Sequence, residues 1–166
     1  MAARDIGDGA IAGVITGVII GVITILLALL GLGTLAQYLD IRAVFGGMIP
    51  AVSGAAITIT AMITVLLFLA IVGLILGAIY GALFENIPTT SAITKGIVFM
   101  VAIWVIFGLL LPLIVGAGVG VAAGVTMAGI LTSLIASIIW GALLGLVFTW
   151  VSRRVAAPGR EPIVRP

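Results

Sequence analysis

Few residues of this 166-residue chain have side chains that could do chemistry. The chain contains seven Lys or Arg and five Asp or Glu, with no His and no Cys. The missing residue types exclude thiolate nucleophiles, disulfides, Cys/His zinc sites and His-ligated haem. No acidic or basic side chain lies in the middle of a long apolar run, which weighs against a pump, a proton-coupled carrier and an intramembrane enzyme. No nucleophile–base pair can be assembled either. We therefore expect no enzyme activity, no cofactor and no metal site.

The remaining polar candidates are one pair of charges and a set of hydroxyls. Glu85 and Lys95 flank a short proline-containing segment, and we expect them to form an ion pair across it; a gate or a substrate contact is the alternative. The hydroxyl groups lie within long apolar runs, where they can form hydrogen bonds to their own helix or to a neighbouring one. A polar conduction path built from them is the alternative interpretation. They belong to Thr16, Thr24, Thr58, Thr60, Thr64, Thr126, Thr132, Ser133 and Ser137.

Small residues recur at a spacing of four in three of the apolar runs. Residues at i and i+4 lie on one face of a helix, and small residues there let another backbone approach closely. We interpret these rows as packing faces within one helix bundle; the alternative is a glycine-lined interface between subunits, or a pore. The rows are Gly9, Gly13, Gly17 and Gly21, then Gly73, Gly77 and Gly81, then Ser133, Ser137, Gly141 and Gly145.

These residues need a membrane-spanning framework to position them. Apolar residues make up 64% of the chain and the mean hydropathy is +1.53, whereas soluble domains are about 45–50% apolar. Charge-free runs, Pro and Gly divide the chain into four helical segments, whose lack of alternation argues against a β-barrel. The predicted fold is all-α: a polytopic bundle of four transmembrane helices in one domain, residues 1–152, followed by a polar tail, 153–166. The predicted spans are 9–36, 54–84, 92–115 and 125–151.

The distribution of basic residues predicts the orientation of the chain. With four spans, both chain ends and the 85–95 loop lie on one side, and Asp40 and Arg42 mark an aqueous turn on the other. Because Lys and Arg in short loops stay cytoplasmic, we expect a multi-pass protein of the cell membrane with both termini in the cytoplasm. The uncharged stretch 116–124 is expected to be buried at the interface or covered by a partner. The basic residues on the side of the termini are Arg4, Lys95, Arg153, Arg154, Arg160 and Arg165.

Several motifs follow one another along the predicted spans. They are a glycine-rich first span, the pattern Gly-x-x-x-Gly-x-x-Tyr-Gly-x-Leu-Phe from Gly73 to Phe84, Lys95-Gly96, a third span with Trp104 and Pro112, and a last span ending in Trp-Gly-x-x-x-Gly. This layout, over residues 9–151, resembles a family of small four-helix membrane proteins of unknown function from bacteria and archaea. Members of that family often carry histidines in the second and fourth spans, which this chain lacks. Because the family has no assigned activity, the resemblance implies the architecture alone.

These features favour a non-enzymatic membrane protein. We expect a structural or accessory subunit that associates through its glycine-rich faces with itself or with a larger membrane complex. A small oligomeric channel or facilitator is the main alternative, and a lipid-binding protein is a third. The composition requires the lipid bilayer as a partner. The small net charge of +2 suggests contact with anionic lipid headgroups rather than nucleic acid.

Overall fold

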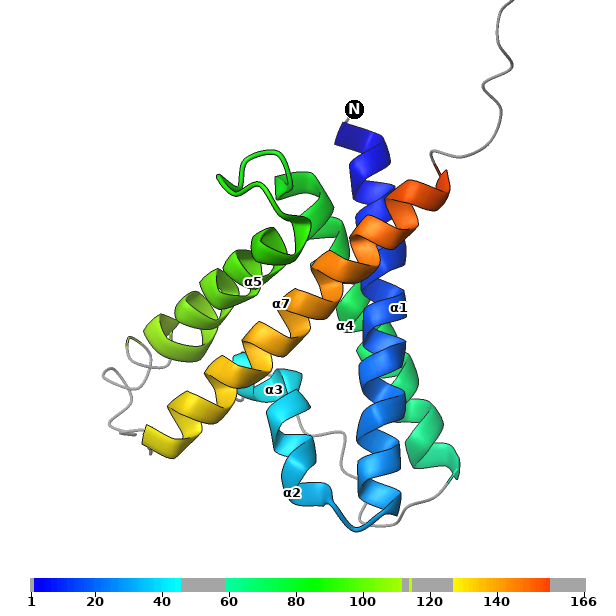
Figure 1. The fold of residues 1–166 in the computed structure, drawn as a ribbon. Helices are drawn as coiled ribbons and strands as arrows, with labels where there is room; N and C mark the ends of the chain where they lie inside the picture. The colour runs from blue at the N-terminus through cyan, green and yellow to red at the C-terminus, as the bar shows by residue number, and fades with distance from the viewer. Residues whose placement is uncertain (1, 46–58, 112–113, 115–126, 156–166) are drawn as a thin grey trace, which may run out of the picture.

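The computed structural model describes residues 2–45, 59–111, 114 and 127–155. The long helices run alternately down and up the bundle (Figure 1). They are α1 (Ala2–Leu29), α4 (Ile59–Leu83), α5 (Ala92–Ile103) with its π-helical continuation η2 (Trp104–Leu110), and α7 (Met127–Val155). Four helical segments are long and apolar enough to cross a membrane. For the residues that the structure describes, the predicted all-α architecture with four spans is confirmed, and the chain is a multi-pass membrane protein by the length and composition of its helices.

The first helix ends earlier than the sequence predicts. α1 stops at Leu29, whereas the predicted span continues to residue 36. Gly31 has a φ of +73°, and the N–H groups of Leu32 and Gly31 donate to the carbonyls of Leu27 and Ala28 at 2.8 and 3.1 Å. This pair of bonds is a Schellman turn, in which glycine adopts the left-handed conformation without Cβ strain. The turn redirects the chain into three short elements, α2 (Gly33–Ala36), η1 (Gln37–Leu39) and α3 (Ile41–Val44).

The later spans differ from the prediction in two details. The third helix changes from α to π hydrogen bonding at Trp104, although the sequence placed a bend only near Pro112. The fourth helix runs to Val155, so Arg153 and Arg154 belong to its last turn. The first residues of the segment that the sequence assigns to a polar tail are thus helical. Basic side chains in the last turn interact favourably with the negative end of the helix dipole, which explains why the helix continues through them.

Several sequence predictions lie outside the described residues. They concern the beginnings of the second and fourth spans, the end of the third, the uncharged stretch 116–124 and the tail beyond Val155.

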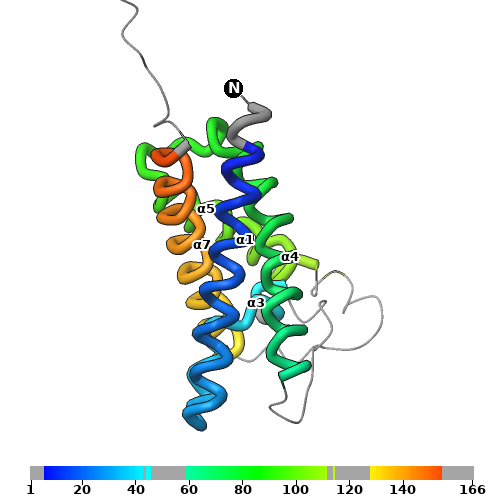
Figure 2. The backbone as a smooth tube through the Cα atoms, turned by 90° about the vertical axis from the view of Figure 1, so that its right-hand side faces the viewer, coloured from blue at the N-terminus to red at the C-terminus, as the bar shows by residue number. Residues whose placement is uncertain are grey.

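Two pairs of helices make up the bundle. α1 packs along α4 and α5 packs along α7, while α7 also contacts α1 (Figure 2). The Tyr80 hydroxyl on α4 donates a hydrogen bond of 2.7 Å to the Ala92 carbonyl at the start of α5. Tyr80, Met100 and Trp140 are almost completely buried where the pairs meet. The pairs therefore form one domain around a shared core.

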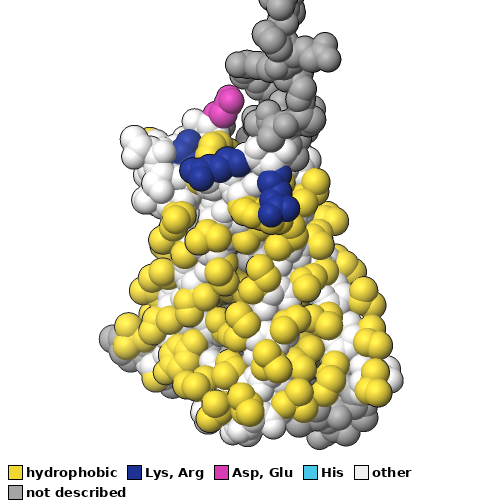
Figure 3. Space-filling model, turned by 45° about the vertical axis from the view of Figure 1, so that its right-hand side comes forward, with side chains coloured by type: hydrophobic (Ala, Val, Ile, Leu, Met, Phe, Trp, Pro, Cys, Tyr) yellow, Lys and Arg dark blue, Asp and Glu magenta, His cyan; other side chains and the backbone are white. Residues whose placement is uncertain are grey.

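The surface of the bundle is apolar over most of its length. Figure 3 shows hydrophobic side chains over the middle and lower parts of the face in view, with Lys and Arg gathered above them. This charged end carries the start of α1 and the last turn of α7 (Figure 1). A broad apolar band with basic residues at its edge is typical of a helix bundle surrounded by lipid.

Candidate functional site

The first two glycine rows face each other across α1 and α4. A Cβ added at Gly9 would lie 2.9 Å from the Gly81 Cα, and one added at Gly77 would lie 2.7 Å from the Gly13 Cα. A Cβ at Gly13 would overlap the carbonyl of Gly73. Since Cβ atoms essentially never approach other atoms within 3.0 Å, the two backbones touch along this line. We call it the α1–α4 seam.

Toward the end of α1, the contacts of the seam change from backbone atoms of α4 to a side chain of α4. A Cβ at Gly17 would lie 2.7 Å from the carbonyl carbon of Leu69 and 3.1 Å from the Ala70 nitrogen, both backbone atoms of α4. A Cβ at Gly21 would instead meet the end of the Leu66 side chain, at 2.9 Å. Because a leucine side chain can change rotamer and a backbone cannot, Gly17 is the last position on this row where only glycine fits.

A second seam joins α5 to α7. A Cβ at Gly141 would lie 2.6 Å from the Cα of Ile97 and 2.8 Å from the carbonyl carbon of Gly96, and one at Gly145 would lie 2.6 Å from the Cα of Ile93. The sequence identified the row on α7 but not its partner, because α5 offers a single glycine there rather than a row. We call this contact the α5–α7 seam.

Hydroxyls extend the same α7 row beyond the glycines. The Ser137 hydroxyl donates to the Leu134 carbonyl at 2.7 Å, and the Ser133 hydroxyl donates to the Gly129 carbonyl at 2.8 Å. The Ser133 oxygen also accepts a hydrogen bond of 2.8 Å from the Trp104 indole N–H. Both serine side chains are thus committed to contacts inside the chain. Every glycine of the two seams likewise meets another helix of the same chain.

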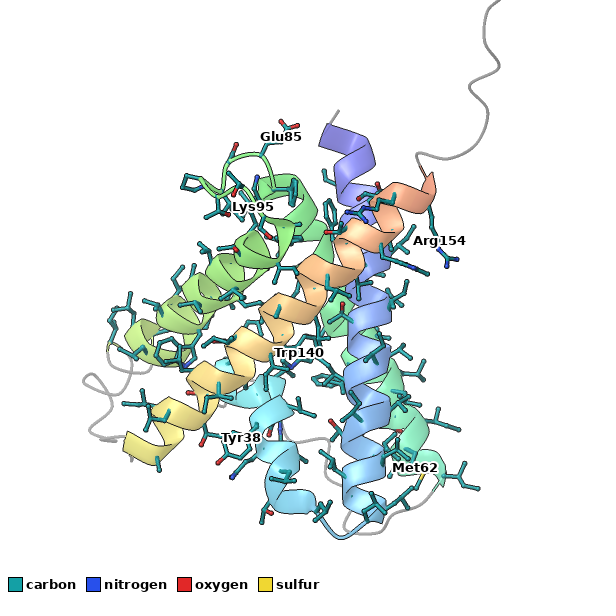
Figure 4. The ribbon with its side chains drawn as sticks, viewed as in Figure 1. Tyr38, Met62, Glu85, Lys95, Trp140 and Arg154 are labelled. Carbon is teal, nitrogen blue, oxygen red and sulfur yellow. The ribbon has the colours of Figure 1, made fainter. Side chains whose placement is uncertain are left out.

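The predicted ion pair between Glu85 and Lys95 is wrong. Both residues are described, and no salt bridge joins them. The Lys95 ammonium instead donates to the Phe84 carbonyl at 2.6 Å and lies 4.3 Å from the centroid of the Phe84 ring; Figure 4 shows Glu85 directed away from the bundle. Phe84 directly follows α4, where the last carbonyls lack helical partners and carry partial negative charge. Binding to those carbonyls therefore stabilises the Lys95 ammonium more than an ion pair with the solvent-exposed Glu85 carboxylate would.

A cavity that the sequence did not reveal lies beside the short elements that follow α1. Asp40 precedes α3 and caps it, because its carboxylate accepts the Arg42 backbone N–H at 2.9 Å. The Arg42 guanidinium binds the same carboxylate, with its Nε 2.9 Å from each oxygen. That hydrogen bond raises the pKa of Arg42 above its ordinary value, so the guanidinium stays charged. The sequence predicted these charges in a water-exposed turn.

Contacts distant in sequence hold the short elements in the bundle. The Trp140 indole N–H on α7 donates to the Leu39 carbonyl at 2.9 Å; Figure 4 shows Trp140 above the segment that carries Tyr38. Ile41 and Val44 of α3 are fully buried. A Cβ at Gly108 of η2 would lie 2.8 Å from the Val44 carbonyl, so the glycine in the π-helical segment lets α3 approach.

The cavity has a volume of about 310 Å³. Val65, Phe68 and Leu69 of α4 supply apolar lining, as do Leu39 and Ile41, while Gln37, Asp40 and Arg42 supply polar groups. The Arg42 side chain is 41% exposed and that of Asp40 is 27% exposed. A pocket with one apolar side and a few convergent polar groups is the usual form of a small-molecule binding site.

Comparison with known proteins gives a family but no activity. A family model described as "Family of unknown function (DUF6789)" matches residues 3–158. No curated protein and no solved structure is significantly similar to the chain.

Proposed function

Because this chain belongs to the DUF6789 family of unknown function, we propose its role from its own geometry: it is a non-enzymatic membrane protein that acts as a structural or accessory subunit. The observation that carries the proposal is the pair of backbone seams. Backbone-to-backbone contact along α1–α4 and α5–α7 leaves little room for helices to slide or part, since each helix holds the other in register. Such rigidity suits a scaffold.

The buried hydroxyls support the same proposal over a conducting role. Thr16 donates to the Ala12 carbonyl at 2.8 Å, as Ser133 and Ser137 donate to carbonyls of their own helix. Hydroxyls bonded in this way have no donor left for a permeating anion. The side chains of Thr16, Ser133 and Ser137 are also buried, so their oxygens do not line an open path for a cation. The channel alternative also needs glycine faces between subunits, and these faces are occupied within the chain.

Association with a partner would therefore use a surface other than the glycine faces named by the sequence. The outward side of α4 is apolar and exposed, as Ile63, Leu67 and Ile71 illustrate. In lipid such a face gains little from hydrophobic burial, so shape and van der Waals contact would select the partner. We place both termini on the cytoplasmic side of the cell membrane, with Lys95 and the Arg153–Arg154 pair at that surface.

The proposal is tested by purifying the tagged protein from membranes of its native host in a mild detergent, after cross-linking within the membrane. Quantitative mass spectrometry then measures the stoichiometry of what remains bound, with an unrelated four-span membrane protein as the control bait. A different membrane protein recovered at a fixed integer ratio, and absent from the control, would support an accessory subunit. A monomer without any stoichiometric partner would contradict it. A ring of identical chains that conducts ions in planar bilayers would replace it with the channel alternative.

A further inference from the structure

The cavity beside α3 combines an anion-binding group with an apolar wall. Arg42 offers five N–H donors in a planar fork. Among the described residues, the hydrogen bonds from the guanidinium all go to Asp40, through Nε and Nη2. The two donors on Nη1 and the second donor on Nη2 remain for a ligand. A guanidinium with free, coplanar donors recognises phosphate oxygens better than any other side chain.

The cavity lies on the acyl-chain side of the lipid headgroups. Thr24 lies five residues before the end of α1, and Leu69 lies ten residues after the start of α4. At about 1.5 Å per residue, these lining residues lie roughly 7–15 Å inward from the helix ends. Spans of 24 and 25 residues extend beyond a hydrocarbon core of about 30 Å by only a few ångströms at each end, so the cavity lies beside the first methylenes of the acyl chains, just below the headgroups.

The rest of the cavity lining is mostly apolar. Val65 and Phe68 of α4 line the same cavity as Arg42, and beside them a fully hydrated anion would lose solvation without compensation. An acyl chain gains from the same surface. From these observations we propose that this cavity is a binding site for an anionic phospholipid, whose phosphate is held by Arg42 and whose acyl chain lies against α4.

Three variants test the site, because one should weaken lipid binding, one should tighten it and one should leave it unchanged. Delipidated protein in detergent is titrated with phosphatidylglycerol, and bound lipid is counted by native mass spectrometry, with phosphatidylcholine as the comparison lipid. Arg42→Gln is expected to weaken phosphatidylglycerol binding by about tenfold or more, since it removes a charge-assisted hydrogen bond. Asp40→Asn is expected to tighten binding, because asparagine still caps α3 and no longer competes for the guanidinium. Arg154→Gln, at the other end of the bundle, is the matched control and should leave binding unchanged.

A fourth variant covers the case in which Arg42→Gln disturbs the fold. Val65→Trp fills the cavity from α4 and leaves both charges in place. It should abolish high-affinity lipid binding while the circular dichroism spectrum stays native.

Equal loss of phosphatidylglycerol binding in Arg42→Gln and Arg154→Gln would show unspecific attraction to basic residues and overturn the proposal. Weaker rather than tighter binding in Asp40→Asn would overturn Arg42 as the phosphate ligand. Displacement of the lipid by millimolar inorganic phosphate or glycerol phosphate would show that the site takes a soluble anion instead. The site does not depend on the proposed accessory role, and its failure would leave that role untouched.

Discussion

Replacing Gly17 by alanine tests whether the α1–α4 seam is a true backbone contact. The added Cβ would lie 2.7 Å from the Leu69 carbonyl carbon and 3.1 Å from the Ala70 nitrogen, whereas ordinary contacts begin at 3.4 Å. Neither neighbour is a flexible side chain, so the helices must separate by roughly 1 Å, and overpacking of this kind costs about 1–3 kcal/mol. We expect Gly17→Ala to unfold at a lower temperature than a suitable control.

Gly7 provides that control on the same helix. A Cβ at Gly7 has no atom within 4 Å, so Gly7→Ala makes the same chemical change without a clash. Both substitutions gain the roughly 1 kcal/mol by which alanine favours a helix over glycine, and this gain cancels when the two variants are compared. The difference between them isolates the overpacking cost. At about 2–4 °C per kcal/mol, Tm should differ by about 2–12 °C.

The assay is thermal unfolding in mild detergent, followed by far-ultraviolet circular dichroism. Gly21→Ala adds an intermediate point, because its new Cβ meets only the end of the Leu66 side chain. The expected order of Tm is Gly7→Ala highest, Gly21→Ala next and Gly17→Ala lowest. Equal melting temperatures for Gly7→Ala and Gly17→Ala would refute the contact between the backbones of α1 and α4.

Three further predictions follow from the same geometry. Single cysteines at Ser91 and Gly33 should react with a membrane-impermeant maleimide from opposite sides, and labelling of Ser91 from outside intact cells would reverse the proposed orientation. Lys95→Met should lower the free energy of unfolding by about 1 kcal/mol, because a carbonyl at the end of α4 loses its donor. Glu85→Gln should leave Tm unchanged. An equal loss of stability in both variants would instead support an ion pair between Glu85 and Lys95. Trp140→Phe removes the hydrogen bond to η1, so amide hydrogen exchange should become faster in η1 and α3 but not in the middle of α4. Unchanged exchange in α3 would show that the indole does not anchor this segment.

The four spans were predictable because each depends on local composition alone. Long charge-free runs identify them, and Glu85-Asn86-Ile87-Pro88 separates α4 from α5. The glycine rows were predictable as faces for a similar reason, since i and i+4 coincide on any helix. Their partners were not, because only tertiary packing decides that Gly141 meets Gly96 on a helix without a row of its own.

The errors have physical causes that local patterns do not contain. The end of the first helix was placed too late because an apolar run continues past Gly31, and only its left-handed φ shows the stop. Lys95 was paired with the nearest acid in sequence, although the free carbonyls at the end of α4 compete better for it. The cavity depends on a bond between Leu39 and Trp140, which are 101 residues apart. A partial signal was present: Asp40 is a strong N-cap residue directly before Ile41-Arg42-Ala43-Val44.

Both seams join helices that are consecutive among the long helices of the chain, and this has a consequence for biogenesis. α1 can close on α4 as soon as α4 leaves the ribosome and enters the bilayer, before any of α7 has been made. The second hairpin can close in the same way, and the contacts of α7 with α1 then dock two preformed halves. Each half completes its own backbone contacts by local search, so insertion needs no long-lived intermediate with an unpaired glycine face. A substitution in the first seam would accordingly expose a faulty hairpin to membrane quality control while translation is still under way.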